Sequence, residues 1–219
     1  YEAAHHDIPV VLNLDHGLHF ESVVRALRLG FTSVMFDGST LEYEENIRQT
    51  REVVKMCHAV GVSVEAELGA VGGDEGGALY GHADEAWFTD PAKARDFVDR
   101  TGIDTLAVAI GNAHGKYKGE PKLDFARLEA IRQQTGLPLV LHGGSGISDA
   151  DFRRAIGLGI HKINFYTGMS QAALDTIEAR MANRQPLYDE FAQLLLSVEE
   201  AITDTVAGQM RVFGSAGQL

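Results

Sequence analysis

The stretch that decides the fold is VVLNLDHGLHFESVVRALRLGFTSVMF, at positions 10–36. It starts with an apolar run at 10–14, continues with an amphipathic helical pattern at 19–29 and, after Gly30, ends with a second apolar run at 33–36. Short apolar runs indicate buried strands, and a helix between two of them is typical of parallel strands joined by a crossover. The unit therefore predicts an α/β fold with a parallel sheet.

The alternation of strand and helix continues along most of the chain. Further strands are expected at 62–68, 105–110, 138–141 and 160–165, and helices at 42–60, 90–101, 124–135 and 149–157. The opening YEAAHHDIPV resembles the end of a helix running into a strand. Six visible units predict a TIM (β/α)8 barrel that lacks its first two strands in this chain, forming one domain over 1–219 with C-terminal helices in 168–207. An open, doubly wound sheet is the alternative.

Composition excludes some classes of function. The formal net charge of -12 argues against a nucleic-acid partner, because phosphate binding needs clustered lysine and arginine. No run of about 18 apolar residues is present, so no membrane span is expected. The single cysteine, Cys57, cannot form an internal disulfide and suits a cytoplasmic location. The Gly- and acid-rich segment 69–86 is the longest stretch expected to be irregular, and loops of that length are usually functional or disordered.

Polar side chains gather where the expected strands end. Parallel α/β folds build their sites at the C-terminal ends of strands. The residues found there are Asp15, His16, Asp37, Glu65, Glu67, His114, His142, Asn164 and Thr167. Three of them, His16, His114 and His142, come from different strands and are each followed by glycine. Neutral imidazoles suit Zn²⁺, and three protein ligands leave a position open for water or substrate.

Two glycine-rich turns follow the last two strands, where barrels commonly bind phosphate through loop amides and a helix N-terminus. They are HGGSG at 142–146 and NFYTG at 164–168, in which Ser145 and Thr167 add hydroxyl groups. Their position indicates an anion site beside the three histidines.

At this point the chain resembles the zinc-dependent class II fructose-bisphosphate and tagatose-bisphosphate aldolases. The matching segments keep the family's order over nearly the whole chain: LDHG, SVMFDGS, EENIRQTREVV, VSVEAELGAVGG, TDPAKARDFV, TLAVAIGNAHGKY, LDFARLEAI, PLVLHGGSG, KIN and VFGSAG. The family's first two βα units, which carry some of its substrate contacts, have no counterpart in the match.

The resemblance implies a role for each matching residue. Zinc ligands would be His16, His114 and His142, with Asp37 and Glu67 as acids that support or transiently bind the metal. Asp15 would move the proton of the C4 hydroxyl, and Glu75 would be the mobile-loop acid. The phosphate pocket would be formed by Gly115, Gly143, Ser145, Asn164 and Thr167, with a monovalent cation near the phosphate. The family also implies a homodimer or homotetramer.

The implied reaction is reversible cleavage of a ketose bisphosphate to dihydroxyacetone phosphate and an aldehyde. Cleavage leaves negative charge next to a carbonyl, which a Lewis acid stabilises, and a carboxylate can remove the hydroxyl proton that starts it.

Three alternatives stay open. Departures from the family in NFYTGM, in GGDEGG and at Asn112 leave the sugar unsettled, so a ketose 1-phosphate without a second phosphate is an alternative substrate. A Schiff-base aldolase would need a lysine at a strand end, and neither Lys162 nor Lys116 is well placed for it. The third alternative is a truncated phosphosugar-binding barrel without catalytic activity.

Overall fold

A computed structural model describes residues 8–75, 78–80, 85–115, 120–183 and 191–218. Six strands form one parallel sheet in the order β1-β2-β3-β6-β7-β8. Their bounds are β1 (Asn13–Gly17), β2 (Ser33–Phe36), β3 (Ser63–Leu68), β6 (Thr105–Val108), β7 (Leu139–Leu141) and β8 (Ile160–Ile163). The helices are α1 (Phe20–Arg28), α2 (Tyr43–His58), α3 (Pro91–Thr101), α4 (Phe125–Thr135), α5 (Asp149–Gly157), α6 (Thr167–Ala182) and α7 (Phe191–Phe213).

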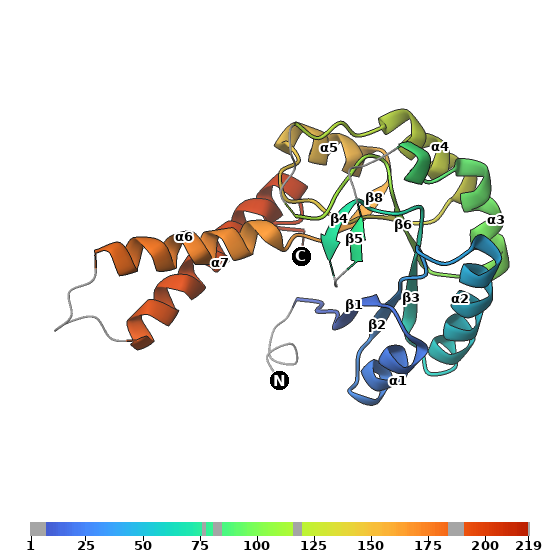
Figure 1. Cartoon of the computed structure of the whole chain (residues 1–219), viewed down its shortest axis with the longest axis horizontal. Coiled ribbons are helices and arrows are strands. Elements are labelled where there is room, and N and C mark those ends of the chain that lie inside the picture. Colours follow the sequence, from blue (N-terminus) through green and yellow to red (C-terminus); the bar gives the residue numbers. More distant parts are fainter. Residues whose placement is uncertain (1–7, 76–77, 81–84, 116–119, 184–190, 219) are drawn as a thin grey trace.

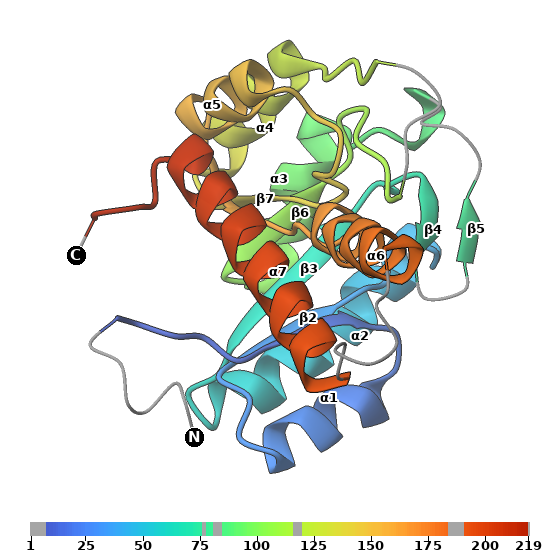
Figure 2. The ribbon, with the colours of Figure 1, turned by 90° about the vertical axis from the view of Figure 1, so that its left-hand side faces the viewer.

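The sheet is curled, and helices α1 to α5 form an arc around its outer side (Figures 1 and 2). A doubly wound sheet would carry helices on both faces, so this arrangement favours the barrel-like prediction over its alternative. The predicted parallel α/β order is confirmed. Among the described helices, none is both long and apolar enough to cross a membrane.

Strand alternation gives the sheet two different faces. Outward-facing residues such as Val34, Phe36 and Val64 join the helices in the main hydrophobic core. Met35, Ala107 and Val140 form a small separate cluster on the opposite, inner face. Side chains two residues apart on a strand share a face, so Glu65 and Glu67 point inward with this smaller cluster.

Helix boundaries follow from local capping chemistry. Asp90 is the N-cap of α3 and accepts hydrogen bonds from the backbone N–H groups of Ala92 and Lys93, while Pro91 fills the first position. Helix α3 ends at Gly102, which adopts a left-handed φ of 72°. These signals explain why the expected helices were close to those observed.

The first strand differs from the prediction, because it spans Asn13–Gly17 instead of 10–14. Val10, Val11 and Leu12 remain 49%, 64% and 50% exposed and lie outside the strand, so their apolar pattern does not mark a buried element here. Asp15 and His16 therefore lie inside a strand and not beyond its end.

A bulge interrupts this strand. Leu14 pairs with Val34 and Gly17 with Phe36, so two residues of β1 oppose one residue of β2. His16 has a φ of 45° and is the one non-glycine residue with positive φ among those described. A bulge of this kind re-aims side chains that would otherwise alternate between faces.

The segment expected to be an irregular loop, 69–86, contains regular structure. Strands β4 (Gly73–Glu75) and β5 (Ala78–Tyr80) form an antiparallel pair, and a 3-10 helix, η2, covers Glu85–Trp87. The prediction of a wholly irregular loop was therefore wrong. Strands of three residues are too short to show hydrophobic periodicity, which is why the pattern did not reveal them.

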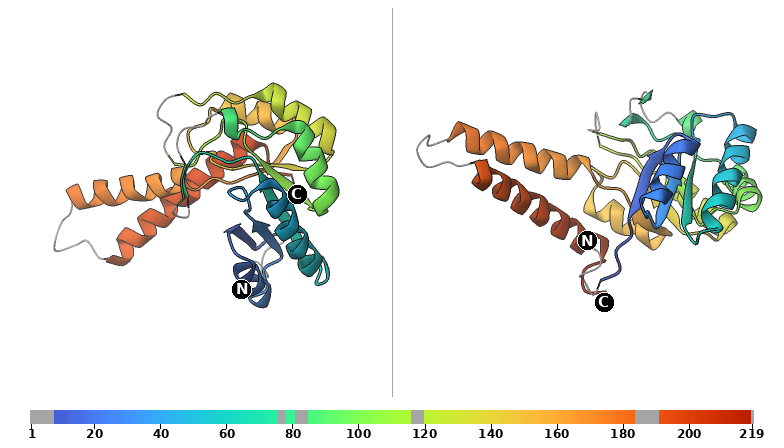
Figure 3. Two further views of the ribbon diagram at one scale, coloured as in Figure 1. Left: turned by 45° about the vertical axis from the view of Figure 1, so that its right-hand side comes forward. Right: turned by 90° about the horizontal axis from the view of Figure 1, so that it is seen from below.

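The expected C-terminal helical region is two helices, α6 and α7, which pack along each other and project away from the sheet (Figures 1 and 3). None of the described residues of either helix is buried. The pair therefore presents much of its side-chain surface outside the main core.

Candidate metal centre and substrate cavity

The three predicted histidines meet on the inner side of the sheet. His16 comes from β1, His142 follows β7 directly, and His114 lies in the loop after β6. One ligand atom from each lies within 4.8 Å of the other two. Their ring centroids are 4.7 Å (His16–His142), 5.2 Å (His16–His114) and 5.9 Å (His114–His142) apart. Such a group of imidazoles from three separate strands has the composition and spacing of a zinc site.

A carboxylate orients His16. Its Nδ1 lies 2.8 Å from Asp37 Oδ2, and Asp37 Oδ1 accepts hydrogen bonds from the backbone N–H and hydroxyl of Ser39. Burial would raise the pKa of Asp37, but the hydrogen bonds from His16 and Ser39 outweigh it and hold the pKa below its usual value. With Nδ1 donating to this carboxylate, Nε2 is the nitrogen that carries the lone pair.

His142 is oriented in the same way by Glu65. The two side chains are 1% and 2% exposed, and His142 Nε2 lies 2.8 Å from Glu65 Oε1. The other oxygen, Oε2, accepts from Lys162 Nζ at 2.6 Å. Burial would raise the pKa of Glu65, but His142 and Lys162 together keep it below the usual value. Within the part of the chain that the structure describes, His142 Nδ1 is buried without a hydrogen-bond partner.

Backbone contacts fix the loops that carry His114 and His142. The His114 N–H donates to Gly72 O at 2.5 Å, and Asn112 Nδ2 donates to the carbonyl of His142 at 3.0 Å. Gly143 has a φ of 66°, and a Cβ at this position would lie 2.2 Å from Ala113 O. Only glycine permits this close approach of the two loops.

Glu67 forms a second possible set of ligands with His16 and Asp37, whose ligand atoms also lie within 4.8 Å of one another. It is 2% exposed, and burial together with the nearby charge of Asp37 raises its pKa well above the usual value. Val71 N–H donates to one carboxyl oxygen, while the other, Oε2, has no partner among the described residues. The structure thus brings all five predicted ligand residues together.

A cavity of about 720 Å³ adjoins His114. Its lining includes Asp15 and every residue predicted for the phosphate pocket, namely Gly115, Gly143, Ser145, Asn164 and Thr167. Asn164 Nδ2 donates to Asp15 Oδ1 at 2.8 Å, which links the last strand to the first. Ser145 Oγ accepts from the Gly168 N–H at 3.0 Å, and Thr167 is the first residue of α6.

Three residues named from the sequence remain to be placed. Glu75 is the last residue of β4, and its role as a loop acid stays a prediction. Lys116 lies outside the described residues. Lys162 lines the cavity, but its Nζ lies 2.6 Å from Glu65 Oε2, so this carboxylate holds the amine that Schiff-base formation would need.

Sequence reasoning missed two supporting roles. Glu65 was identified only as a polar residue near a strand end, and Lys162 only as a weak Schiff-base candidate. Glu65 and Glu67 are two residues apart on one strand, so the sequence already indicated that both side chains share a face. Which residues they contact depends on how far the sheet curls. Asn112, first noted as a departure from a family pattern, holds the backbone of the His142 loop.

Comparisons with known proteins agree with this geometry. Residues 1–218 match a family model described as "Fructose-bisphosphate aldolase class-II". The chain is 47% identical over 211 residues to a probable fructose-bisphosphate aldolase of Bacillus subtilis, which covers 96% of this chain and 73% of that protein. A fructose-bisphosphate aldolase of Geobacillus stearothermophilus is also 47% identical, with 96% and 72% covered.

Solved structures of aldolases also resemble this chain. The crystal structure of the YdjI aldolase from Escherichia coli K12 superposes with a TM-score of 0.85 and 40% identity, covering 99% of this chain and 74% of that one. A putative fructose-1,6-bisphosphate aldolase from Coccidioides immitis superposes with a TM-score of 0.86 and 33% identity, covering 97% and 74%. The chain thus spans about three quarters of the length of these relatives.

Proposed function

The chain belongs to the class II fructose-bisphosphate aldolase family, and from this premise we propose that it is a zinc-dependent enzyme that reversibly cleaves fructose 1,6-bisphosphate to dihydroxyacetone phosphate and an aldehyde. The observation that carries the proposal is the meeting of His16, His114 and His142 beside a cavity lined by Asp15. Tagatose 1,6-bisphosphate is the second sugar to test, and the names of the curated relatives favour fructose.

The donor set fits zinc. Three imidazoles are borderline-soft ligands of the kind zinc prefers, and the buried Nδ1 of His142 lacks another partner among the described residues. Asp37 and Glu65 hold two of these rings in fixed orientations, as carboxylates commonly do for metal-binding histidines. When bound, zinc would supply a Lewis acid for the carbonyl oxygen that gains negative charge during carbon–carbon cleavage.

Asp15 is proposed to take the proton from the C4 hydroxyl in cleavage and to return it in condensation. It lines the cavity next to His114, and Asn164 holds one of its oxygens at 2.8 Å. This hydrogen bond leaves the second oxygen of the carboxylate to face a substrate hydroxyl. A positioned carboxylate of this kind contributes about 10²–10⁴-fold to a rate as a general base.

The phosphate of the dihydroxyacetone phosphate half is proposed to bind between the turn at Gly143–Ser145 and the start of α6. Helix N-termini bind anions because their first N–H groups lack partners within the helix. Ser145 and Thr167 line this side of the cavity with hydroxyl groups, and Gly115 completes it. A monovalent cation near this phosphate, and Glu75 as a further acid, remain parts of the proposal.

The proposal also includes the architecture of the barrel and the assembly of the subunits. We propose that the curled six-stranded sheet corresponds to six of the eight strands of a TIM barrel, since the chain superposes on longer aldolases. We further propose a homodimer or homotetramer that uses the projecting helices α6 and α7, because Phe191, Leu195 and Leu196 are 74%, 52% and 63% exposed there.

One pair of variants tests the mechanism. His114→Ala is expected to lose zinc and cleavage together, and Asp15→Asn is expected to keep zinc but lose about 10²-fold or more in cleavage rate. Asp99→Asn, on the exposed side of α3, is the matched control for the charge change. Zinc content by mass spectrometry and cleavage of fructose 1,6-bisphosphate are the measurements.

Two results would contradict the assignment. Full zinc stoichiometry in His114→Ala would remove this residue from the ligand set, and wild-type cleavage by Asp15→Asn would remove the proton shuttle. Comparing fructose 1,6-bisphosphate with ketose 1-phosphates, at saturating zinc, separates the two substrate classes. Cleavage of the monophosphates alone would favour the alternative without a second phosphate.

A further inference from the structure

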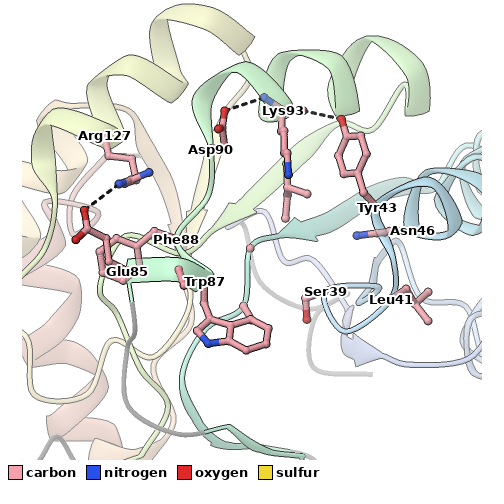
Figure 4. Close-up of a pocket in the computed structure, with 14 residues that line it drawn as sticks. Ser39, Leu41, Tyr43, Asn46, Glu85, Trp87, Phe88, Asp90, Lys93 and Arg127 are labelled. Atoms are coloured by element: carbon pink, nitrogen blue, oxygen red, sulfur yellow. Dashed lines mark hydrogen bonds and ion pairs between the residues drawn. The ribbon is translucent and has the colours of Figure 1, made fainter.

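A second cavity, of about 390 Å³, lies on the C-terminal side of the sheet between α2, α3 and η2 (Figure 4). It shares no lining residue with the 720 Å³ cavity of the proposed active site. Its walls come from the loop before α2, from the end of β3 and from the 3-10 helix η2. A hollow of this size matches the lower range of small-molecule sites.

One wall of this cavity is aromatic and apolar. Trp87 is 52% exposed and Leu41 is 36% exposed, and both line the cavity (Figure 4). Tyr43 closes the inner side, where its hydroxyl donates to Lys93 O and to Asp96 Oδ2. A flat ring that covered Trp87 would remove its apolar surface from water, and aromatic pairs gain further from stacking.

The charged residues of the cavity are not equivalent. Arg127 is held by Asp124 at 3.0 Å, by Glu85 at 3.6 Å and by the Phe88 ring at 5.4 Å. Asp90 is occupied as the N-cap of α3.

Lys93 differs, because its ammonium lies 5.7 Å from the centre of the Tyr43 ring and no described carboxylate lies within 4.0 Å of it. Among the described residues that line the cavity, Lys93 is thus the cation without a carboxylate partner, in a chain whose net charge is -12.

This cavity is connected to the proposed metal centre by hydrogen bonds. Ser39 lines it and donates its hydroxyl to Asp37 Oδ1 at 2.6 Å, and Asp37 Oδ2 lies 2.8 Å from His16 Nδ1. Asn46, another lining residue, donates to the carbonyl of Glu67 at 3.1 Å. A ligand in this cavity lies against Ser39 and Asn46, so its contacts there alter how firmly Asp37, and through it His16, is held.

From these observations we propose that the cavity binds a small aromatic carboxylate, with its ring on Trp87 and its carboxylate on Lys93, and that its occupancy changes the affinity of the metal centre. The binding stands apart from the proposed function, whereas the coupling rests on the proposed zinc ligands. By linkage, any change that the acid makes in zinc affinity must equal the change that zinc makes in the affinity for the acid.

The chain supplies its own reporter, because Trp87 is its single tryptophan. Benzoate titrated into the metal-free protein is expected to change the tryptophan emission along a saturating curve. Benzamide has the same shape without the charge, and it is expected to bind at least about tenfold more weakly, the loss that follows from one missing charge-assisted hydrogen bond. The same loss for benzoate is expected in Lys93→Gln, while Lys55→Gln, on the exposed side of α2, should bind as wild type does.

Two outcomes would overturn the proposal. A linear change in emission, or equal affinity for benzamide and benzoate, would show that no carboxylate site exists there. Saturable binding of benzoate without any change in zinc affinity, measured by chelator competition at saturating benzoate, would remove the coupling to the metal centre. Loss of cleavage activity in the mechanistic variants above would not affect the benzoate titration, which uses the metal-free protein.

Discussion

At the scale of single residues, the carboxylate of Glu65 connects the proposed metal centre to the 720 Å³ cavity of the proposed active site. It accepts from His142 on one oxygen and from Lys162, which lines the cavity, on the other. A buried carboxylate is costly unless both of its oxygens find partners. Lys162 therefore serves to keep Glu65 charged, and Glu65 in turn keeps the lone pair of His142 on Nδ1.

Replacing Lys162 tests this chain of contacts. Lys162→Met leaves Glu65 buried with one partner, and we expect zinc affinity to fall about 10–100-fold, as for other changes in groups that orient metal ligands. Competition with a chromophoric chelator measures it, and Lys55→Met provides the control. Unchanged affinity in a variant with wild-type circular dichroism would show that Lys162 does not act through Glu65.

Cys57 gives a pH-dependent prediction. Its side chain is fully buried, and burial raises the pKa of the thiol from 9.0 to about 11. Between these values the folded state keeps a proton that the unfolded state releases, so the free energy of unfolding falls as pH rises from 9 to 11. The drop is on the order of 2 kcal/mol.

Denaturant unfolding of wild type and Cys57→Ala across this pH range isolates the effect, because lysines and tyrosines titrate in both proteins. The difference between the two curves should shrink towards alkaline pH. A constant difference would mean that the thiol ionises equally in the folded and unfolded states.

Residue types at strand ends were enough to predict which side chains would lie together. His16, His114 and His142 each follow or end an apolar run, and the structure places them together. The ion pair of Glu65 with Lys162 joins residues 97 positions apart, so no local pattern indicated it. The cavity around Trp87 was equally hidden, because its walls come from four separate segments of the chain.

At the scale of elements, helices were predicted more accurately than strands. Capping residues such as Asp90 and Gly102 mark helix ends in the sequence itself. The first strand was placed three residues too early, because the apolar run at 10–12 suggested burial that the sheet does not provide. The bulge at His16 also depends on pairing with β2, which the sequence of β1 alone does not contain.

The projecting helices give a prediction about assembly. If they form the interface between subunits, Leu196→Glu places a charge in that interface and lowers the oligomeric state measured by light scattering. Gln134→Glu adds the same charge on the exposed side of α4, outside the α6–α7 pair, and should leave assembly unchanged. An identical mass for Leu196→Glu and wild type would place the interface elsewhere.

At the scale of the whole molecule, the metal centre links strands from distant parts of the sheet. His16 lies in the first strand of the order and His142 follows the fifth. A ligand that binds only the folded state stabilises it in proportion to the logarithm of its concentration. Metal binding is therefore expected to stabilise the entire sheet and not only its loops.

Thermal unfolding measures this effect. Free zinc at a thousandfold excess over its dissociation constant adds about 4 kcal/mol of stability, and this raises the Tm of a chain of this size by about 8–16 °C. Chelation should reverse the rise, and His114→Ala should show none of it. A Tm that does not respond to zinc in the wild type would contradict the three-histidine site.

The alternation of strand and helix predicted the parallel sheet and the five helices between its strands. It did not predict the short β4–β5 pair, whose strands are three residues each. The degree of curl was also absent from the pattern, since it arises from twist between neighbouring strands. The number of βα units, and not the periodicity within them, indicated a barrel and so a curled sheet.

The hydrogen bond between Asp15 and Asn164 joins residues 149 positions apart. Neighbouring strands in the sheet also follow one another along the chain, so pairing can proceed from β1 to β8 through short loop closures. The contact between Asp15 and Asn164 joins the two ends of this order, so it forms only once both edge strands are in place. The proton transfer proposed for Asp15 would thus depend on the completed sheet.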